Sequence, residues 1–240
     1  MRILVTNDDG IEAPALVSLV EWAKTLGDVL VVAPLYEQSG KSQGIDIIHP
    51  FYVKETTLAG TRAYAVDSTP ADCVRFALLG LQEEFDLVIS GINRGFNLGR
   101  DIVYSGTVGA IYEAANLGVR SLALSTAPSS MENAIAHLDT MWQYFTTNTL
   151  FRKNDIYNVN FPMMEPKGIR ITRQGGPYYS DVFTKQEDGT YTQTGIFVFE
   201  ESGDLSLDTD STLAGYISIT PLTQERTDLG VYEELKQLNS

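Results

Sequence analysis

The stretch ILVTNDDG at residues 3–10 decides the fold, because a short apolar run breaks there at two adjacent carboxylates and a glycine. An apolar run followed by a turn is typical of a strand buried on both faces of a sheet. Pro14 then suits the first turn of a helix, and apolar residues recur at helical spacing over 16–23. A buried strand that leads directly into a helix is the first unit of a parallel sheet.

The same alternation continues to residue 172. The spacing predicts further strands at 29–33, 86–90, 121–125 and 157–161, and a pair of strands at 51–54 and 62–66. It predicts helices over 107–117 and 131–145, and one that starts at Pro70 after the capping residue Thr69. We therefore predict an α/β fold whose core, residues 1–172, is a three-layer, Rossmann-like, doubly wound and mostly parallel sheet.

The composition changes after this core. Residues 173–213 are polar and rich in Gly, Asp, Thr and Tyr, with one alternating stretch over 191–199, which predicts a β-hairpin arm. Residues 214–240 are expected to add a strand at 216–220 and a helix at 231–238. Projecting arms favour exchange of identical elements between subunits, so we expect this one to support a homodimer or a tetramer.

Charge and hydropathy exclude several classes of protein. The 240 residues carry 17 Lys and Arg against 31 Asp and Glu, a net charge of −14, with 43% hydrophobic residues. Extensive disorder is excluded by that apolar content, and binding to a nucleic-acid polymer is excluded by that charge. No apolar run approaches the length that spans a bilayer, and the N-terminus turns polar too early for a signal peptide. We expect a cytoplasmic protein with no membrane partner.

Ligands of open α/β sheets bind beyond the carboxyl ends of the strands, where this chain places three notable loops. The first loop contains Asp8 and Asp9, whose adjacent carboxylates repel each other and lose solvation unless a cation lies between them. Oxygen ligands suit Mg²⁺, Mn²⁺ or Ca²⁺ rather than zinc. The alternative is that one aspartate caps the following helix and the other is solvated.

The other two loops carry features of phosphate sites. The stretch SGKS at residues 39–42 resembles half of a phosphate loop, but the full Walker pattern is absent, and alone it is more typical of a flexible turn. Residues 90–107 combine glycines, amides and hydroxyls before a helix N-terminus, whose free N–H groups suit an anion. An ordinary glycine-rich loop is the alternative. Together the three loops predict a metal-assisted phosphate site.

Several segments along the chain resemble the SurE family of stationary-phase survival proteins, which are metal-dependent 5′/3′-nucleotidases. The matching segments share their order and residue types, and they are ILVTNDDG (3–10), VAP (32–34) with SG (39–40), STPADCV (68–74), SGIN (90–93) with Gly95 and NLG (97–99), YSGTVGA (104–110), NVNFP (158–162) and YISITPL (216–222). The first of these and the YSGTVG stretch are highly specific. The pattern departs from the family at three positions, Asp46, Ser68 and Arg100; the first and last are expected near the mouth of the site.

The resemblance implies a phosphomonoesterase that hydrolyses nucleoside 5′- and 3′-monophosphates to nucleoside and phosphate, with some activity on short polyphosphate. It implies one Mg²⁺ or Mn²⁺ ion per subunit, held by Asp8, Asp9, Ser39 and Asn93. Asp8 and Asp9 are then also the catalytic residues, and Asp8 is expected to orient or deprotonate the attacking water. The non-bridging phosphate oxygens are expected to be held by Asn97, Ser105, Gly106 and Thr107.

Other reactive residue types have simpler interpretations. His49, expected in a strand region, and His137, expected on a helix, are predicted to be structural, and Cys73 is predicted to be a small buried apolar residue. Tyr178 and Tyr179 could stack on a base or pack at an oligomer interface.

Three other functions are alternatives to this one. A phosphorelay receiver domain needs a phospho-accepting Asp after a central strand and a late Lys, but the strand at 86–90 ends in Ser-Gly and no Lys follows 121–125. A haloacid-dehalogenase-type phosphatase needs a second Asp two residues after the first, whereas Asp8 and Asp9 are adjacent. A metal- and nucleotide-binding sensor without turnover stays open as the alternative.

Overall fold

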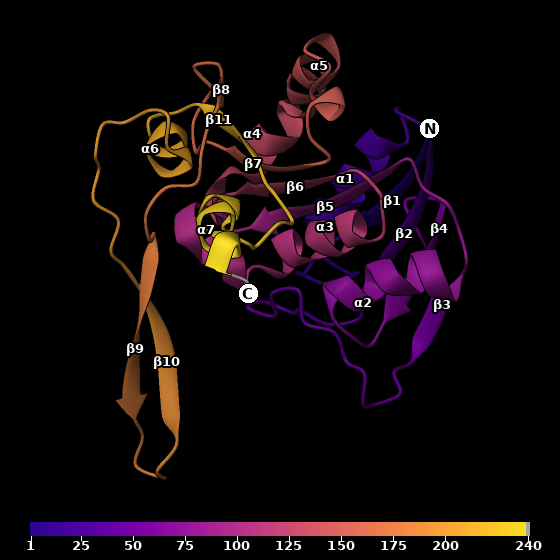
Figure 1. Cartoon of the computed structure of the whole chain (residues 1–240). Helices are drawn as coiled ribbons and strands as arrows, with labels where there is room; N and C mark the ends of the chain where they lie inside the picture. The colour runs from indigo at the N-terminus through magenta and orange to yellow at the C-terminus, as the bar shows by residue number, and fades with distance from the viewer. Residues whose placement is uncertain (239–240) are drawn as a thin grey trace.

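A nine-stranded sheet forms the centre of the structure, a computed structural model that describes residues 1–238 (Figure 1). The strands follow the order β3-β4-β2-β1-β5-β6-β7-β11-β8. Their bounds are β1 (Arg2–Thr6), β2 (Asp28–Pro34), β3 (Val53–Leu58), β4 (Thr61–Val66), β5 (Leu87–Arg94), β6 (Ser121–Thr126), β7 (Ile156–Phe161), β8 (Ile169–Ile171) and β11 (Ile217–Pro221). Only the β3–β4 and β7–β11 pairs of this sheet are antiparallel. The predicted mostly parallel α/β fold is confirmed.

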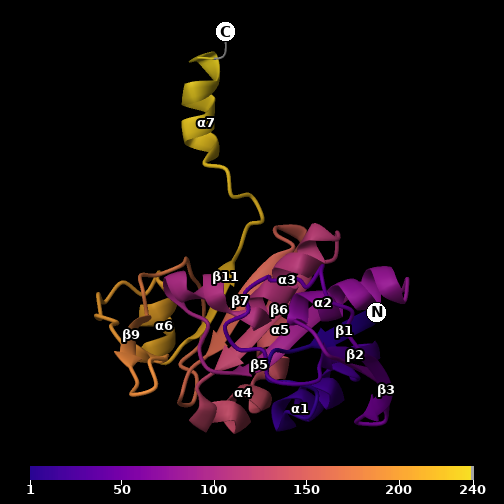
Figure 2. The same cartoon turned by 90° about the horizontal axis from the view of Figure 1, so that it is seen from below.

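Helices cover both faces of this sheet. Their bounds are α1 (Pro14–Ala23), α2 (Pro70–Arg75), α3 (Gly106–Asn116), α4 (Met131–Ala136), α5 (Leu138–Thr147), α6 (Asp208–Leu213) and α7 (Leu229–Leu235). Figure 2 shows α1 and α4 on one side of the sheet and α2 and α3 on the other. Alternate residues of β1 serve the two layers, since Ile3 and Val5 belong to the apolar cluster under α1 and Leu4 to the cluster under α2. This is the predicted three-layer, doubly wound arrangement.

Local capping fixes where the two helices nearest the site begin. The Thr69 hydroxyl accepts a hydrogen bond from the Asp72 N–H at 3.1 Å, and Pro70 occupies the first turn of α2 as predicted. The Ser105 hydroxyl accepts from the Val108 N–H at 3.1 Å, so that α3 begins at Gly106. The free N–H groups of α3 therefore face the carboxyl ends of the strands.

Two predicted elements have different bounds in the structure. The predicted helix 131–145 is interrupted at His137, whose backbone leaves the helical region and whose imidazole Nδ1 bonds the Asn133 carbonyl at 2.9 Å. The predicted strand 86–90 continues through Arg94, because β5 shifts register between Ser90 and Asn93 and then pairs again with β6. Residues 91–94, expected in a loop, are therefore part of the sheet. Conversely, the strand expected at 51–54 begins only at Val53, and His49 lies in a loop rather than a strand.

The C-terminal third contains the predicted hairpin and two unpredicted elements. Strands β9 (Tyr179–Lys185) and β10 (Tyr191–Phe197) form a separate antiparallel sheet that projects from the core (Figure 1). Strand β8 and helix α6 were not predicted. Helix α6 packs on the core, with Asp208–Thr212 buried. Helix α7 stands away from the core (Figure 2). Among residues 1–238, no helix is long and apolar enough to cross a bilayer.

Candidate active site

A cavity of about 940 Å³ opens at the carboxyl ends of β1 and β5. It is lined by residues from the three predicted loops and from the hairpin, which are Asp8, Asp9, Glu37, Ser39, Gly40, Asn93, Arg94, Phe96, Asn97, Asp101, Tyr104, Ser105, Tyr179, Asp181, Gln193 and Gly195. All four predicted metal ligands are among them, together with Asn97 and Ser105 of the predicted phosphate-binding set. The structure therefore brings Asp8 together with Asn93, which lies 85 positions later in the sequence.

Asp8 lies at the bottom of the cavity and is 4% exposed. Burial is the main cause that raises the pKa of its carboxyl to about 6; the hydrogen bond from Thr107 lowers that pKa, and the charge of Asp9 raises it. The Thr107 hydroxyl donates to Asp8 Oδ1 at 2.5 Å, so its hydrogen is already used within the protein. Thr107 and Gly106 do not line the cavity; they contact the Asp8 carboxylate.

Gly106 permits this close approach of Asp8 to the start of α3. A Cβ at position 106 would lie 3.0 Å from Asp8 Cβ and 3.1 Å from Asp8 Oδ2. Even alanine would press against the carboxylate and displace it. Gly106, which was predicted to bind phosphate, thus leaves the space that the Asp8 side chain occupies.

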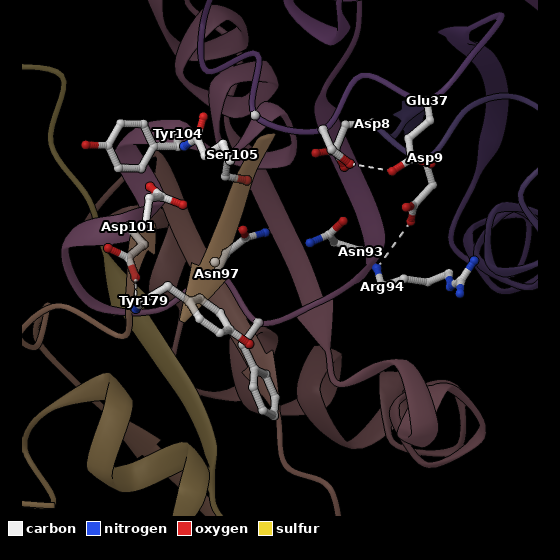
Figure 3. A pocket seen from close by; sticks show the side chains of 16 residues that line it. Asp8, Asp9, Glu37, Asn93, Arg94, Asn97, Asp101, Tyr104, Ser105 and Tyr179 are labelled. Carbon is white, nitrogen blue, oxygen red and sulfur yellow. Dashed lines mark hydrogen bonds between the residues drawn. The ribbon is translucent and has the colours of Figure 1, made fainter. Parts of the chain in front are cut away.

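Asp9 places further negative charge beside Asp8, and Glu37 does so beside Asp9. Asp9 Oδ2 accepts from the Arg94 N–H at 3.2 Å, the contact drawn in Figure 3. Burial raises the pKa of Asp9, Arg94 lowers it through its N–H and its charge, and Glu37 raises it. The Ser39 hydroxyl donates to Glu37 Oε1 at 2.7 Å, so the lone pairs of the Ser39 oxygen remain available to a ligand.

The four predicted ligands have the chemistry that a hard cation requires. Asn93 donates its Nδ2 hydrogen to the Gly95 carbonyl at 2.9 Å and keeps its amide oxygen for another partner. Buried Asp8 and half-buried Asp9 are adjacent carboxylates with raised pKa values, which makes their ionisation costly, and a divalent cation would offset that cost. In the part of the chain that the structure describes, no three His, Cys, Asp or Glu side chains converge on a metal position. The predicted ligand set contains only two carboxylates, and the hydroxyl of Ser39 and the amide of Asn93 would supply the other oxygen ligands of the cation.

The hairpin contributes a part of the cavity wall that was not predicted from the sequence. The β9–β10 register pairs Asp181 with Gly195 and Phe183 with Gln193, so the hairpin residues that line the cavity share one face. Asp101 anchors the start of the hairpin, since its Oδ2 accepts from the N–H groups of Tyr178 at 3.0 Å and Tyr179 at 2.6 Å. Nothing in the spacing of these residues indicates that the arm returns to the site.

The two tyrosines of the arm have different environments. Tyr178 is 6% exposed and packs edge-on against Phe96 and Phe197, at centroid distances of 6.2 and 5.1 Å. Burial raises the pKa of its hydroxyl to about 12. Tyr179 is 50% exposed and lines the cavity. Tyr178 packs within its own chain, which neither interpretation of this pair anticipated, and of the two tyrosines only Tyr179 is placed to meet a ligand.

The remaining predicted residues lie outside the cavity. Cys73 is buried and unpaired, as predicted. His49 is exposed and contacts Asp46, and His137 joins α4 to α5, so neither histidine lines the site. The three departures from the family pattern also lie outside the lining: Asp46 receives the His49 N–H, Ser68 donates to Asp72 at 2.5 Å, and Arg100 is exposed.

Comparison with known proteins agrees with the resemblance seen in the sequence. The family described as survival protein SurE matches residues 3–181. A relative named 5′-nucleotidase SurE from Natranaerobius thermophilus is 36% identical, over 98% of this chain and 97% of its own length, and one of the same name from Petrotoga mobilis is 37% identical over 98% of each. The crystal structure of the SurE protein from Aquifex aeolicus superposes with a TM-score of 0.78 at 31% identity, over 100% of both chains. The chain therefore belongs to the SurE family.

Proposed function

We propose that this protein is a metal-dependent 5′-nucleotidase that hydrolyses nucleoside monophosphates to nucleoside and inorganic phosphate. The observation that carries the proposal is the pair of adjacent carboxylates, buried Asp8 and half-buried Asp9, in a cavity large enough for a nucleotide. The names of the relatives support the substrate class. The same chemistry extends to 3′-monophosphates and to short polyphosphate, which present the same terminal phosphoryl group.

One Mg²⁺ or Mn²⁺ ion would be held by Asp8, Asp9, Ser39 and Asn93, all of which line the cavity. When bound, such an ion supplies positive charge that stabilises the phosphoryl group as negative charge builds on it. Asp8 has one oxygen engaged by Thr107, which leaves Oδ2 to orient or deprotonate the attacking water. Asn97 and Ser105 would bind the non-bridging oxygens beside the N-terminus of α3.

The outer half of the cavity suits the nucleoside. Tyr104 and Tyr179 are 65% and 50% exposed, and both rings line the cavity. Figure 3 shows them on the same side of the cavity, across from Asp9 and Arg94. An aromatic ring offers every base a stacking surface without reading its hydrogen-bonding edge. We therefore expect broad base tolerance, with Gln193 and Asp181 as the polar groups nearest to the sugar and base.

The first test is phosphate release from AMP near neutral pH, after removal of metal with EDTA and after addition of Mg²⁺ or Mn²⁺. We expect release only with metal, and loss of at least about two orders of magnitude in the Asp9→Asn protein, because a negative charge that balances the ion is lost. The matched control is Asp28→Asn, since Asp28 is exposed at the amino end of β2, away from the cavity. A folded protein that binds metal and nucleotide but releases no phosphate would instead be the nucleotide-binding sensor.

A further inference from the structure

Two buried asparagines lie beneath the site loop, in a place where a strand ordinarily carries apolar side chains. Asn158 and Asn160 are on β7 and are both 0% exposed. They alternate with Tyr157 and Val159, which join the apolar cluster on the opposite face of the sheet. Asparagine is uncommon in strands, and burial of a carboxamide costs free energy unless its hydrogen bonds are made. The burial of these two side chains therefore calls for hydrogen-bond partners nearby.

Both carboxamides bind the backbone of a single residue, Asn97. Asn160 Oδ1 accepts from the Asn97 N–H at 2.9 Å, and Asn160 Nδ2 donates to the Asn97 carbonyl at 2.8 Å. Asn158 Nδ2 donates to the same carbonyl at 2.8 Å. Asn97 lies in the irregular segment between β5 and the 3₁₀ turn η2 (Gly99–Tyr104). Its backbone is therefore held by side chains of a core strand, which gives a loop residue the fixed position of a sheet residue.

The side chain of Asn97 is fixed as well, and it faces the site. Its Nδ2 donates to Ser125 Oγ on β6 at 2.7 Å. One Nδ2 hydrogen and the Oδ1 atom remain, and within residues 1–238 neither has a protein partner. Figure 3 shows this side chain pointing into the cavity, as Asn93 does. The four hydrogen bonds that Asn97 makes thus leave its Oδ1 atom and one Nδ2 hydrogen free to bind a ligand.

The stability of β7 does not account for these amides. Asn158 Oδ1 is buried without a hydrogen-bond partner among the described residues, and an unpaired buried oxygen destabilises a fold. Neither asparagine lines the cavity, so neither can touch a substrate there. The hydrogen bonds that connect Asn158 and Asn160 with the cavity run through Asn97.

We propose that Asn158 and Asn160 are positioning residues that hold the Asn97 carboxamide toward the phosphoryl group of the substrate. The inference rests on the proposed function, in which Asn97 binds that group. A donor held in place before the substrate arrives costs no reorganisation during the reaction, which is why a rigid strand is a better support than the loop itself.

A double-mutant cycle tests this role. Asn160→Leu keeps a similar volume and removes both of its contacts with Asn97; we expect kcat/KM for AMP to fall about tenfold, and less in Asn158→Leu, which removes one contact. In an Asn97→Ala background the Asn160→Leu change should cost less than about twofold, because the group that it positions is already gone. Equal losses in both backgrounds would show a general structural effect and would overturn the proposal.

The control is Val159→Ala, which removes buried side-chain volume from the same strand on the opposite face. We expect it to lower Tm and to leave kcat/KM of the folded protein unchanged. Amide hydrogen exchange of the Asn97 N–H should become faster in Asn160→Leu and not in Val159→Ala. Unchanged exchange in Asn160→Leu would also overturn the proposal.

The same variants separate a failure of this inference from a failure of the proposed function. If the native protein hydrolyses no nucleotide, the cycle is repeated with the Kd of inorganic phosphate in the presence of Mn²⁺. We then expect about tenfold weaker binding in Asn160→Leu. Native affinity in that variant would overturn the positioning role alone, and a native protein that binds no phosphate would overturn both.

Discussion

At the scale of single residues, Asp8 makes the metal-free fold sensitive to pH. Burial raises its pKa to about 6, from the 3.8 of an exposed aspartate. Between these two pH values the folded protein keeps a proton that the unfolded chain releases, so the metal-free protein loses stability as pH rises from about 4 to about 6. Above that range the buried charge costs on the order of 3 kcal/mol.

Asp8→Asn removes this charge. We expect it to raise the Tm of EDTA-treated protein at about pH 7.5, and to raise it much less at about pH 4.5, where Asp8 is already protonated in the folded state. The Tm is measured by calorimetry at both pH values, with exposed Asp28→Asn as the control that shifts neither. An equal change at both pH values would contradict a buried, ionised Asp8. Added Mn²⁺ should reverse the order, because it stabilises the native carboxylate and not the amide.

At the scale of elements, the hairpin and the site loop are joined by carboxylates. Asp101 on η2 receives the Tyr178 and Tyr179 N–H groups, and Asp208 on α6 receives the N–H groups of Gly99 and Gly175, at 3.0 and 2.8 Å. A two-stranded hairpin is marginally stable alone, so these contacts at its base determine how well its inner face stays on the cavity.

Asp101→Ala leaves two backbone N–H groups without their acceptor, a loss of about 1–3 kcal/mol for the local structure. We expect faster proteolysis within residues 179–197 and a KM for AMP raised several-fold, because Tyr179 and Gln193 no longer stay on the cavity. Asp101→Asn is the matched variant, since its amide oxygen can accept the same hydrogen bonds. If both variants are cleaved and turn over AMP as the native protein does, the hairpin is not held by Asp101.

The elements also show which parts of the structure could be predicted from the sequence. Apolar runs and caps such as Thr69 are local signals, so the strand–helix order and the meeting of three loops at one sheet edge could be predicted. The ligand set Asp8, Asp9, Ser39 and Asn93 was implied by the family resemblance. At the break, His137 contacts Glu165, which belongs to a distant segment that local periodicity does not include. The extension of β5 past Gly91 depends on pairing with β6. The wall formed by Tyr179 and Gln193 arises from tertiary contacts that no local spacing encodes.

At the scale of the whole molecule, the described chain leaves two elements without a partner. Helix α7 has no buried residue, although Leu229, Val231, Tyr232 and Leu235 are apolar. Figure 2 shows it away from the core. A helix of 7 residues is too short to be stable alone in water. The outer part of the hairpin is likewise exposed on both faces, with Phe183 62% exposed.

Both features favour the predicted homo-oligomer, in which a second copy covers α7. We expect the native protein to sediment as a dimer or a larger assembly at micromolar concentration, and the double variant Val231→Asp with Tyr232→Asp to shift toward the monomer, because charged side chains oppose burial of that helix. Glu234→Gln on the same helix is the control and should keep the native mass. A native protein that sediments as a monomer would show that α7 is stabilised in some other way.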